Sequence, residues 1–423
     1  MAHLLSRLGP WVGLPRQILR AFNGRSRLPI HEIDKAKVEK HRAHIRPFPL
    51  NSGNVAFSAW RLAHAIKKAD CLRWPSAPIL WAGASGFLLE NGHLFDWGAD
   101  EFSLKSGMAD FYADFTGSGL AGRVAQGMAL LFLEEKGYAY VGRFETEWKQ
   151  RASKQNKAWP TGKEKAPDFI AENSKNEWVL AESKGGFAPV DMKPNIKGAL
   201  KDGLDQLDGW DKRMTPQPIK SFVIGTFLYE SVSTTDETSV IAFVDPEPEA
   251  PENPVEFSRD AVRRANYASW LSVMGFEDAS IRVRYNAGET QRRLVPIVTL
   301  AGRKFAVSIA SVSPNQFDVS SREFWDDIQD WPFLPFGWFG RGISVELIGL
   351  DLTVLQTLGT TELSSKMSGL MELKPNEISD APIEAEGGAF NGSIFSDGSL
   401  LGELRLTRSR KPIPDLEWIE VEF

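Results

Sequence analysis

Two carboxylates and a lysine in the stretch KAPDFIAENSKNEWVLAESKGG, residues 165–186, have the types and spacing that phosphodiester chemistry requires. Asp168 precedes the apolar run FIA, and Glu182 follows the run WVLA, two residues before Lys184. Carboxylate oxygens suit Mg²⁺, which keeps several of its waters and bridges to substrate phosphate. A bound metal stabilises charge that develops on the phosphate and lowers the pKa of a bound water. These residues therefore predict a divalent-cation site for Mg²⁺ or Mn²⁺.

The period of a β-strand determines how these side chains would meet. Side chains alternate along a strand, so Glu182 and Lys184 are expected on one face and Ser183 is expected to face away. We expect Glu182 to ligate the metal and Lys184 to orient or activate the attacking water. The backbone carbonyl of Ser183 would complete the coordination, and a neighbouring strand would bring Asp168 to the same sheet edge.

The elements that must position these residues lie between 118 and 244. The segment GLAGRVAQGMALLFLEEKGY places apolar residues on one helical stripe and ends at Gly137, a good helix stop. Pro194 suits the first turn of a second helix, whose apolar stripe recurs every three to four residues. The predicted order is a helix over 119–138, strands over 138–144, 167–171 and 177–183, a helix over 194–207, and strands over 221–229 and 239–245.

Pro167-Asp168, followed after thirteen residues by Glu182-Ser183-Lys184, resembles the PD-(D/E)XK signature of restriction-endonuclease-like nucleases. The predicted helix, three strands, helix and strand over 118–230 are similar to the core of that family. The resemblance implies an α/β fold with a mixed central sheet flanked by helices. It implies Asp168 and Glu182 as metal ligands and Lys184 as the catalytic lysine of a Mg²⁺-dependent deoxyribonuclease. It also implies a restriction or anti-phage defence setting.

Two positions depart from the pattern of the family. Relatives often carry a further acid on the first core helix, about eleven residues before its terminal glycine, where this chain has Gln126. A neutral amide can hold a water or a phosphate but weakens a metal site. This favours the alternative of a catalytically weak or inactive nuclease-fold subunit that binds nucleic acid or a partner protein. Some relatives carry Gln-x₃-Tyr on the second helix, and Gln206 followed by Trp210 matches that motif loosely.

A basic segment, KQRASKQNKAWPTGKEK, is predicted to be a turn-rich loop that leads into Asp168. Its cations can neutralise phosphates of DNA, and Trp148 and Trp159 can stack on bases. An ordinary solvated loop is the alternative. Lys197 and Lys201 on the second helix either extend this basic track or form an exposed face. The candidate nucleic-acid-binding residues are Lys149, Arg151, Lys154, Lys157, Lys163, Lys165 and Gln206.

The flanking regions differ in charge from the middle of the chain. Residues 1–47 carry ten Lys and Arg against three Asp and Glu, although the whole chain has a net charge of −6. An organelle transit peptide, a basic arm for nucleic acid or a partner, and a plain solvated segment remain open. DPEPEAPENPVE contains five acids, four prolines and no base, and therefore predicts an extended linker. The predicted regions are a basic arm over 1–47, an accessory region over 48–117, a nuclease-like domain over 118–244, the linker over 245–256 and a C-terminal accessory domain over 257–423.

The accessory regions carry mixed signals. In the first, 56–69 has helical spacing, and LLENGHLF (88–95) carries an Asn-Gly hairpin signal. The C-terminal domain opens with a predicted helix over 258–275. Short strands with turn signals at YNAGET, LAGRK, FNG and SDG follow, which is typical of a strand-rich α+β fold.

Composition favours a folded, reduced protein of 423 residues. A hydrophobic content of 42% with 14 Trp is enough for substantial cores. The lone Cys71 excludes an internal disulfide framework and indicates a reducing compartment, for which we expect the cytoplasm. The longest apolar run, MALLFL, is too short to span a membrane. Cutting both strands of DNA would favour a homo-oligomer.

Three other patterns are weaker. GSGLAG (117–122) matches the dinucleotide fingerprint, but the residues before it make a poor buried strand. His41 and His44 have no third metal-binding neighbour at useful spacing. The tryptophans within 324–342 can form a binding surface, although an aromatic core is the more common use.

Overall fold

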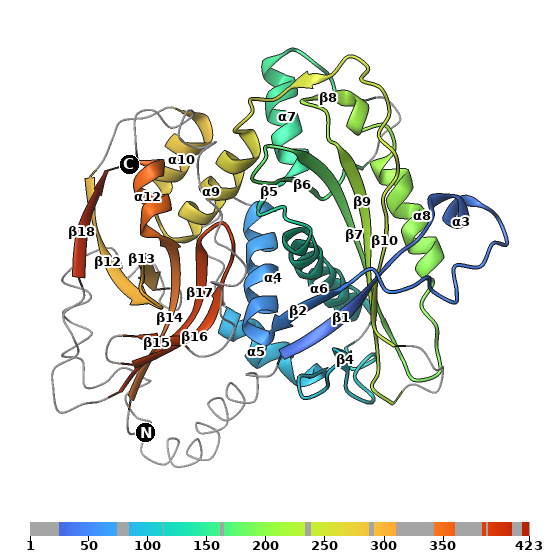
Figure 1. Cartoon of the computed structure of the whole chain (residues 1–423), viewed down its shortest axis with the longest axis horizontal. Helices are drawn as coiled ribbons and strands as arrows, with labels where there is room; N and C mark the ends of the chain where they lie inside the picture. The colour runs from blue at the N-terminus through green and yellow to red at the C-terminus, as the bar shows by residue number, and fades with distance from the viewer. Residues whose placement is uncertain are drawn as a thin grey trace.

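A mixed seven-stranded sheet organises the first half of the chain in the computed structural model (Figure 1). The structure describes residues 25–73, 84–112, 114–160, 165–232, 238–286, 292–309, 342–359, 383–385, 388–407 and 417–422. A separate antiparallel sheet organises the second half. The protein is therefore a mixed α/β chain with an additional antiparallel sheet.

Seven strands of the described chain form the first sheet in the order β2-β1-β10-β9-β7-β6-β5. β7 lies parallel to β9 and β1 lies parallel to β10, while the remaining neighbours are antiparallel. Apolar runs in β9 and β10 are buried along their length, as expected for central strands. The strands are β1 (Arg25–Glu32), β2 (Asn54–Ser58), β5 (Tyr140–Arg143), β6 (Phe169–Glu172), β7 (Trp178–Ala188), β9 (Lys220–Tyr229) and β10 (Val240–Val244).

The predicted order of elements between 119 and 245 is confirmed, with one added α-helix and two short added elements. α6 (Asp114–Glu135) starts five residues earlier than predicted. Gly137 follows it with φ of 87°, a left-handed conformation that ends the helix without Cβ strain. α8 (Ile196–Leu207) begins after Asn195, whose side chain accepts a hydrogen bond from the N–H of Gly198. The added α-helix is α7 (Phe144–Lys154), and the two short elements are η2 (Asp211–Arg213) and β8 (Met214–Thr215).

α7 replaces the first part of the loop that was predicted from the basic composition. Its buried residues Phe144, Trp148 and Ala152 recur at intervals of four, which puts them on one face of a helix. Acidic residues in the first turn and basic residues in the last turn complement the helix dipole. The prediction of a turn-rich loop was therefore wrong up to Lys154.

The helices α6 and α8 cover opposite faces of the sheet. Gly185 of β7 lies so close to α6 that a Cβ atom there would be 2.5 Å from the Cβ of Ala125. Gly203 of α8 lies directly against Val223 of β9, which is the register partner of Glu182. Because side chains alternate along β7, Glu182 and Lys184 share the face of α8, and Gly185 belongs to the face of α6.

The N-terminal regions contribute directly to this half. β1 comes from within 1–47, which was predicted to be an arm, and residues 1–24 lie outside the described part. Asn91 and Gly92, the predicted hairpin signal, instead end one helix and begin a 3₁₀ turn. The elements are α3 (Lys35–Glu39), α4 (Ala59–Arg73), α5 (Ala84–Asn91), η1 (Gly92–Leu94), β3 (Phe95–Asp96) and β4 (Ser103–Leu104), the last two paired antiparallel.

The acidic, proline-rich segment 245–256 lies against the first half. Its end forms β11 (Val255–Glu256), which pairs in parallel with β8 (Met214–Thr215) after η2 (Asp211–Arg213). The N–H of Glu252 donates to the carbonyl of Lys212 at 2.7 Å. The segment is therefore held by backbone pairing, contrary to the prediction of an extended linker.

The second sheet is antiparallel, in agreement with the predicted strand-rich α+β character. β12 pairs with β13 on one side and with β15 and β18 on the other, so the sheet closes on itself. The LAGRK and SDG turn predictions are confirmed between β12 and β13 and between β16 and β17, whereas FNG lies within β16 and YNAGET falls largely outside the described residues. The elements are α9 (Ala261–Val273), α10 (Glu277–Tyr285), β12 (Arg292–Leu300), β13 (Arg303–Ile309), β14 (Gly342–Asp351), α12 (Leu352–Leu358), β15 (Ile383–Ala385), β16 (Gly388–Ile394), β17 (Ser399–Thr407) and β18 (Glu417–Glu422).

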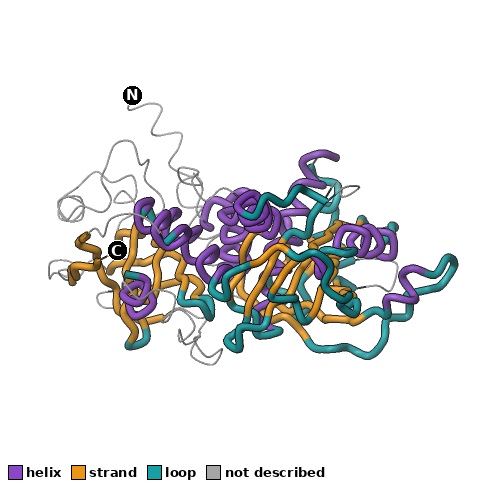
Figure 2. Tube along the Cα trace, turned by 90° about the horizontal axis from the view of Figure 1, so that it is seen from above, coloured by secondary structure: helices purple, strands orange, loops and turns teal. Residues whose placement is uncertain are grey.

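α4 lies between the two halves, and α3 with the loop after it reaches away from the body (Figures 1 and 2). α4 packs against α6 on one side and against β16 and β17 on the other. A buried ion pair of 2.6 Å joins Lys68 of α4 to Asp397 of the β16–β17 turn. The two halves therefore share a core and charged contacts.

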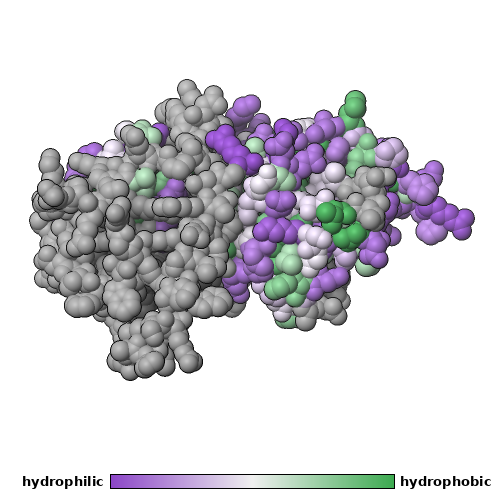
Figure 3. All heavy atoms as spheres, turned by 90° about the horizontal axis from the view of Figure 1, so that it is seen from below, coloured by the Kyte–Doolittle hydropathy of each residue, from purple (hydrophilic) through white to green (hydrophobic). Residues whose placement is uncertain are grey.

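On the face shown in Figure 3, the described surface is mostly hydrophilic with small hydrophobic patches. None of the described helices combines the length and apolarity that crossing a membrane requires.

Candidate active site

Asp168 lies where β5 ends and β6 begins, beside the middle of β7. Phe169, the next residue, pairs with Arg143 of β5 on one side and with Ala181 of β7 on the other. The N–H of Asp168 donates to Oε2 of Glu182 at 3.0 Å. Its carbonyl accepts from the N–H of Phe144 at 3.3 Å. The backbone therefore fixes Asp168 beside β7.

β7 continues beyond the end of its ladder with β6. The β6 ladder ends at the pair of Phe169 and Ala181, whereas the β9 ladder continues to Ala188. Glu182 and Lys184 therefore lie in mid-strand and not at a strand end as predicted. Because β6 no longer pairs there, the N–H of Ser183 is free of the ladder and donates to Oδ2 of Asp168 at 3.2 Å.

The carboxylate of Asp168 is held by two neighbours. Nη1 of Arg143 lies 2.8 Å from Oδ1, and the hydroxyl of Ser183 donates to Oδ2 at 2.6 Å. The Asp168 side chain keeps 14% of its surface exposed. Ser183 was predicted to face away from the site, but its hydroxyl reaches Asp168 around the open strand edge.

Glu182, Lys184 and Gln206 form the second part of the site. Nζ of Lys184 donates to Oε1 of Glu182 at 2.8 Å. With the Gln206 amide oriented to satisfy both neighbours, its nitrogen donates to Oε1 of Glu182 at 2.7 Å and its oxygen accepts from Lys184 Nζ at 2.5 Å. Glu182 is 3% exposed and Lys184 is 20% exposed, so the lysine is the more accessible of the two. The structure thus brings Asp168, Glu182, Lys184, Ser183 and Gln206 into one hydrogen-bonded group.

Burial changes the acidity of Glu182. Loss of water around the carboxyl, followed by the negative charge of Asp168, raises the pKa of Glu182 to about 7. The positive charge of Lys184 and its hydrogen bond act in the opposite direction. The carboxyl of Glu182 therefore gains and loses its proton near neutral pH.

Gln126 does not join the group. It lies buried on α6, next to Ala125, and α6 covers the face of β7 opposite to Glu182 and Lys184. Among the described hydrogen bonds, none links its amide to Asp168, Glu182 or Lys184. The predicted role of Gln126 in catalysis has no support in this geometry.

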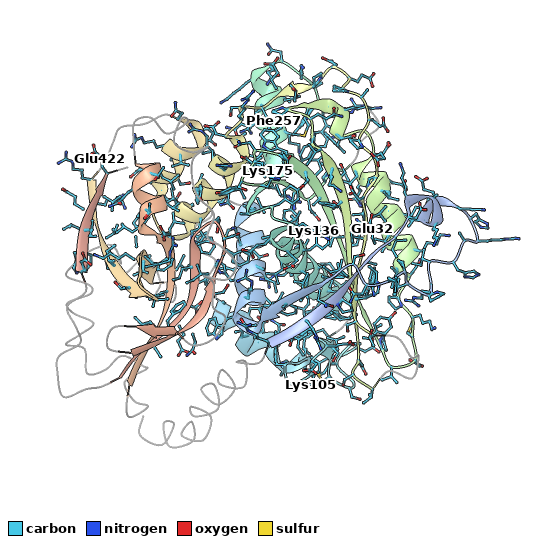
Figure 4. All side chains as sticks on the ribbon, in the orientation of Figure 1. Glu32, Lys105, Lys136, Lys175, Phe257 and Glu422 are labelled. Carbon is cyan, nitrogen blue, oxygen red and sulfur yellow. The ribbon has the colours of Figure 1, made fainter. Side chains whose placement is uncertain are left out.

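The predicted nucleic-acid-binding cations have different surroundings. Arg151 lies 2.5 Å from Oε2 of Glu147 and packs over the ring of Phe257, so it is held within the fold. Phe257 is labelled in Figure 4. Lys157 donates to the carbonyl of Pro254 in the acidic segment. Both therefore have structural partners.

The remaining cations are more exposed. Lys149 pairs with Glu145 on α7 and lies over the ring of Trp159, 4.7 Å from its centre. Lys154 and Lys165 are exposed, and Lys163 lies outside the described residues. Of the predicted contacts, Lys149, Lys154 and Lys165 remain accessible to a phosphate backbone.

The tryptophans expected to stack on bases pack against each other. Trp148, Trp159 and Trp210 form a triangle with ring centres 4.9–5.5 Å apart. Trp148 is buried and Trp159 is half-buried. Nε1 of Trp210 donates to the carbonyl of Lys165, which fixes the backbone just before Asp168. The tryptophan cluster thus helps to hold the backbone segment that leads into Asp168.

The donor set fits Mg²⁺ by type. Asp168 and Glu182 supply hard oxygens, and the carbonyl of Ser183 points to the same strand edge as its N–H, which contacts Asp168. No group of three or more His, Cys, Asp or Glu side chains in the described residues is arranged to hold a metal. A cation would therefore be held by two carboxylates, one carbonyl and water.

The three weaker sequence patterns do not belong to this group of residues. Gly117, Gly119 and Gly122 lie within α6, so GSGLAG is part of a helix and not a turn between a strand and a helix. His41 and His44 follow α3 in a loop. The tryptophans of 324–342 lie outside the described residues.

Arg143 is the site residue that the sequence did not reveal. It ends β5, and the antiparallel register with β6 places it opposite Phe169, next to Asp168. In the sequence, Arg143 is visible only as a basic residue at the end of the run YVG. Its pairing with Asp168 becomes apparent only once the strand order is known. Comparisons with protein-family models, with curated proteins and with solved structures find no match for this chain.

Proposed function

We propose that this chain is a divalent-metal-dependent nuclease of the PD-(D/E)XK type that hydrolyses phosphodiester bonds of DNA. One observation carries the proposal: Asp168, Glu182 and Lys184 form a single hydrogen-bonded group at the open edge of β7. Two acids can hold a divalent cation, and a lysine beside them adds positive charge, so this partly exposed group supports metal-assisted hydrolysis. The order of elements around the group further supports the family assignment.

Each residue has a role in this proposal. Asp168, Glu182 and the Ser183 carbonyl would hold Mg²⁺ or Mn²⁺, which supplies charge neutralisation and a bound water of lowered pKa. Lys184 orients the attacking water and contributes positive charge near the phosphate. Gln206 hydrogen-bonds to both Glu182 and Lys184 and so helps to hold the directly paired side chains in one arrangement.

The substrate and setting belong to the same proposal. The accessible cations Lys149, Lys154 and Lys165 near α7 would contact the DNA backbone. A restriction or anti-phage defence role, with a second copy of the chain to cut the opposite strand, is the setting we propose. Cys71 is free and buried, which agrees with a reducing, cytoplasmic location.

A cleavage assay tests the proposal. The full chain is incubated with duplex DNA, single-stranded DNA or RNA and with Mg²⁺ or Mn²⁺. We expect cleavage of DNA, and a loss of at least about a hundredfold in rate for Asp168→Ala and for Lys184→Ala. Lys175→Ala, in the turn between β6 and β7 (Figure 4), and Asp278→Ala, on α10, are matched controls at exposed positions.

Two results would contradict the proposal. Cleavage that persists at the wild-type rate in both site variants assigns the activity to another group or to a contaminant. Equal losses in the control variants would show that the effect is not specific to the site.

A second candidate is a nuclease-fold subunit that binds nucleic acid or a partner without turnover. Two observations favour it: α6 contributes no acid to the group, and Arg143 already neutralises Asp168. DNA binding that is unchanged by Mg²⁺ and by Asp168→Ala, without cleavage of any substrate, would support this candidate.

A further inference from the structure

Arg143 is the charged neighbour of the site that the proposed chemistry does not use. Its side chain is 17% exposed, and its Nη1 lies 2.8 Å from Oδ1 of Asp168. The ladder between β5 and β6 fixes its backbone opposite Phe169, so Arg143 stands beside Asp168 before any ligand arrives. The contact is built into the sheet and is not a chance surface pairing.

The site is neutral as it stands. With Glu182 ionised, Asp168 and Glu182 carry two negative charges, and Arg143 and Lys184 carry two positive charges. Every carboxylate oxygen accepts at least one hydrogen bond from the protein. A divalent cation would add two positive charges next to a guanidinium in a partly buried site, where like charges repel strongly.

Arg151 on α7 provides a comparison, because it forms a structural ion pair close to Arg143 in the sequence. Arg151 pairs with Glu147, which is 3% exposed and also binds Arg284 at the same carboxylate. That carboxylate has two arginines and faces no candidate ligand site. Arg143 differs because its ion pair within the described part of the chain is with Asp168, a candidate metal ligand.

We infer that Arg143 competes with the metal for Asp168 and transfers to a substrate phosphate when the metal binds. This inference rests on the proposed function. A displaced guanidinium needs an anion, and the planar fork of arginine fits a phosphate with two parallel hydrogen bonds. The phosphodiester that a bridging metal would contact is the anion nearest to it. Metal and nucleic acid therefore bind cooperatively, and each raises the affinity for the other.

Mn²⁺ binding measured by electron paramagnetic resonance on the full chain tests this inference. The probes are Mn²⁺ alone and Mn²⁺ with a phosphorothioate duplex that resists hydrolysis. The variants are Arg143→Gln, Arg143→Lys and Asp168→Asn. Arg123→Gln is the matched control, because Arg123 forms an ion pair with Asp70 on α4 and not with a carboxylate of the site.

We expect Arg143→Gln to bind Mn²⁺ about tenfold more tightly than wild type without DNA, because a competing charge is gone. The duplex should raise Mn²⁺ affinity in wild type and in Arg123→Gln, but not in Arg143→Gln. Arg143→Lys keeps the charge and loses the planar fork of the guanidinium. Its Mn²⁺ affinity without DNA should therefore stay near that of wild type, while the increase in Mn²⁺ affinity caused by the duplex should be smaller.

The outcomes separate the inference from the proposed function. If Asp168→Asn binds Mn²⁺ as well as wild type does, the metal site and the proposed function are both overturned. If Asp168→Asn loses binding but Arg143→Gln matches wild type or binds more weakly, only the inference is overturned. Should Arg143→Gln not fold, an unchanged gain from the duplex in Arg143→Lys overturns the inference.

Discussion

At the scale of single residues, the chemistry depends on how much charge Glu182 carries at neutral pH. Burial and the negative charge of Asp168 raise its pKa to about 7, although Lys184 opposes the shift. A carboxyl that is half-protonated near neutrality is a weaker metal ligand than a full carboxylate, because the proton and the metal compete for the same oxygens. Metal affinity should therefore rise with pH through this range.

The same shift predicts a pH-dependent effect of Glu182→Gln on stability. In the unfolded chain the carboxyl ionises near its ordinary pKa of 4.5, while in the folded chain it retains its proton up to about 7. The unfolded state therefore loses its proton first as pH rises, and wild type loses stability between pH 4.5 and 7. Relative to wild type, Glu182→Gln should gain on the order of 3 kcal/mol in free energy of unfolding across this window.

Urea denaturation at pH 4.5, 6 and 8 measures this difference. Glu252→Gln, at an exposed position of the acidic segment, serves as the control and should show no comparable trend. A difference between Glu182→Gln and wild type that stays constant with pH would contradict the pKa shift.

Site residues that share one strand or one motif were predictable, and cross-strand partners were not. Asp168, Glu182 and Lys184 follow from residue type and spacing, and Gln206 from a loose helical motif. Arg143 becomes a site residue only through the register of β5 with β6, which local sequence does not encode. Gln126 was placed by counting along a helix, which does not report the sheet face that the helix covers.

At the scale of elements, the contact between α6 and β7 determines how the strand is held. Gly185 leaves no room for a side chain, because a Cβ would lie 2.5 Å from the Cβ of Ala125 and 2.8 Å from the carbonyl oxygen of Ala121. Both obstacles belong to a buried helix surface that cannot move away on its own. Gly185 therefore permits the close approach of α6 directly behind Glu182 and Lys184.

We predict that Gly185→Ala destabilises the protein and that Gly119→Ala does not. Overpacking at Gly185 should cost about 1–3 kcal/mol in free energy of unfolding. Gly119 lies at an exposed position of α6, where an added Cβ atom would meet no other atom within 4 Å. Alanine at Gly119 should therefore stabilise the helix by about 0.5–1 kcal/mol. Chemical denaturation of both variants checks the pair.

If Gly119→Ala lowered the free energy of unfolding and Gly185→Ala did not, α6 would not pack on β7 in this register. Loss of stability in both would indicate that the exposed start of α6 has a contact not present in the described residues.

Elements were predictable where one periodicity dominates. The order of α6, β5, β6, β7, α8, β9 and β10 follows from apolar runs and stop signals. α7 was missed because the basic composition after Trp148 outweighed the spacing of Phe144, Trp148 and Ala152. β7 continues beyond its predicted end at Ser183 to Ala188, and close packing under α6 explains Gly185 within the strand.

At the scale of the whole molecule, regions far apart in sequence complete each half. β1 and β2 enter the first sheet from the N-terminal regions, and the segment 245–256 pairs back through β11. Composition suggested an arm and a spacer because charge and proline content report local tendencies. The long-range pairing that captures both segments depends on strand order, which the sequence alone did not supply.

The junction between the halves has a buried charged cluster. Asp397 accepts from Lys68 at 2.6 Å and from Nδ2 of Asn266 at 2.7 Å, and its carbonyl accepts from Tyr267. The ring of His64 lies beside Phe395, with centres 4.5 Å apart. The cluster therefore ties α4, α9 and the β16–β17 turn into one interior.

We predict that Asp397→Ala destabilises both halves together, by about 3–5 kcal/mol, because Lys68 would remain buried without its counter-ion. Hydrogen exchange should show β7 and β17 losing protection by the same factor, since one cooperative unit opens as a whole. The double variant Lys68→Met with Asp397→Leu should recover part of the loss, because no single charge is then left in the interior. If β17 alone lost protection while β7 kept it, the halves would unfold independently, and the candidate site would not depend on the C-terminal sheet for its stability.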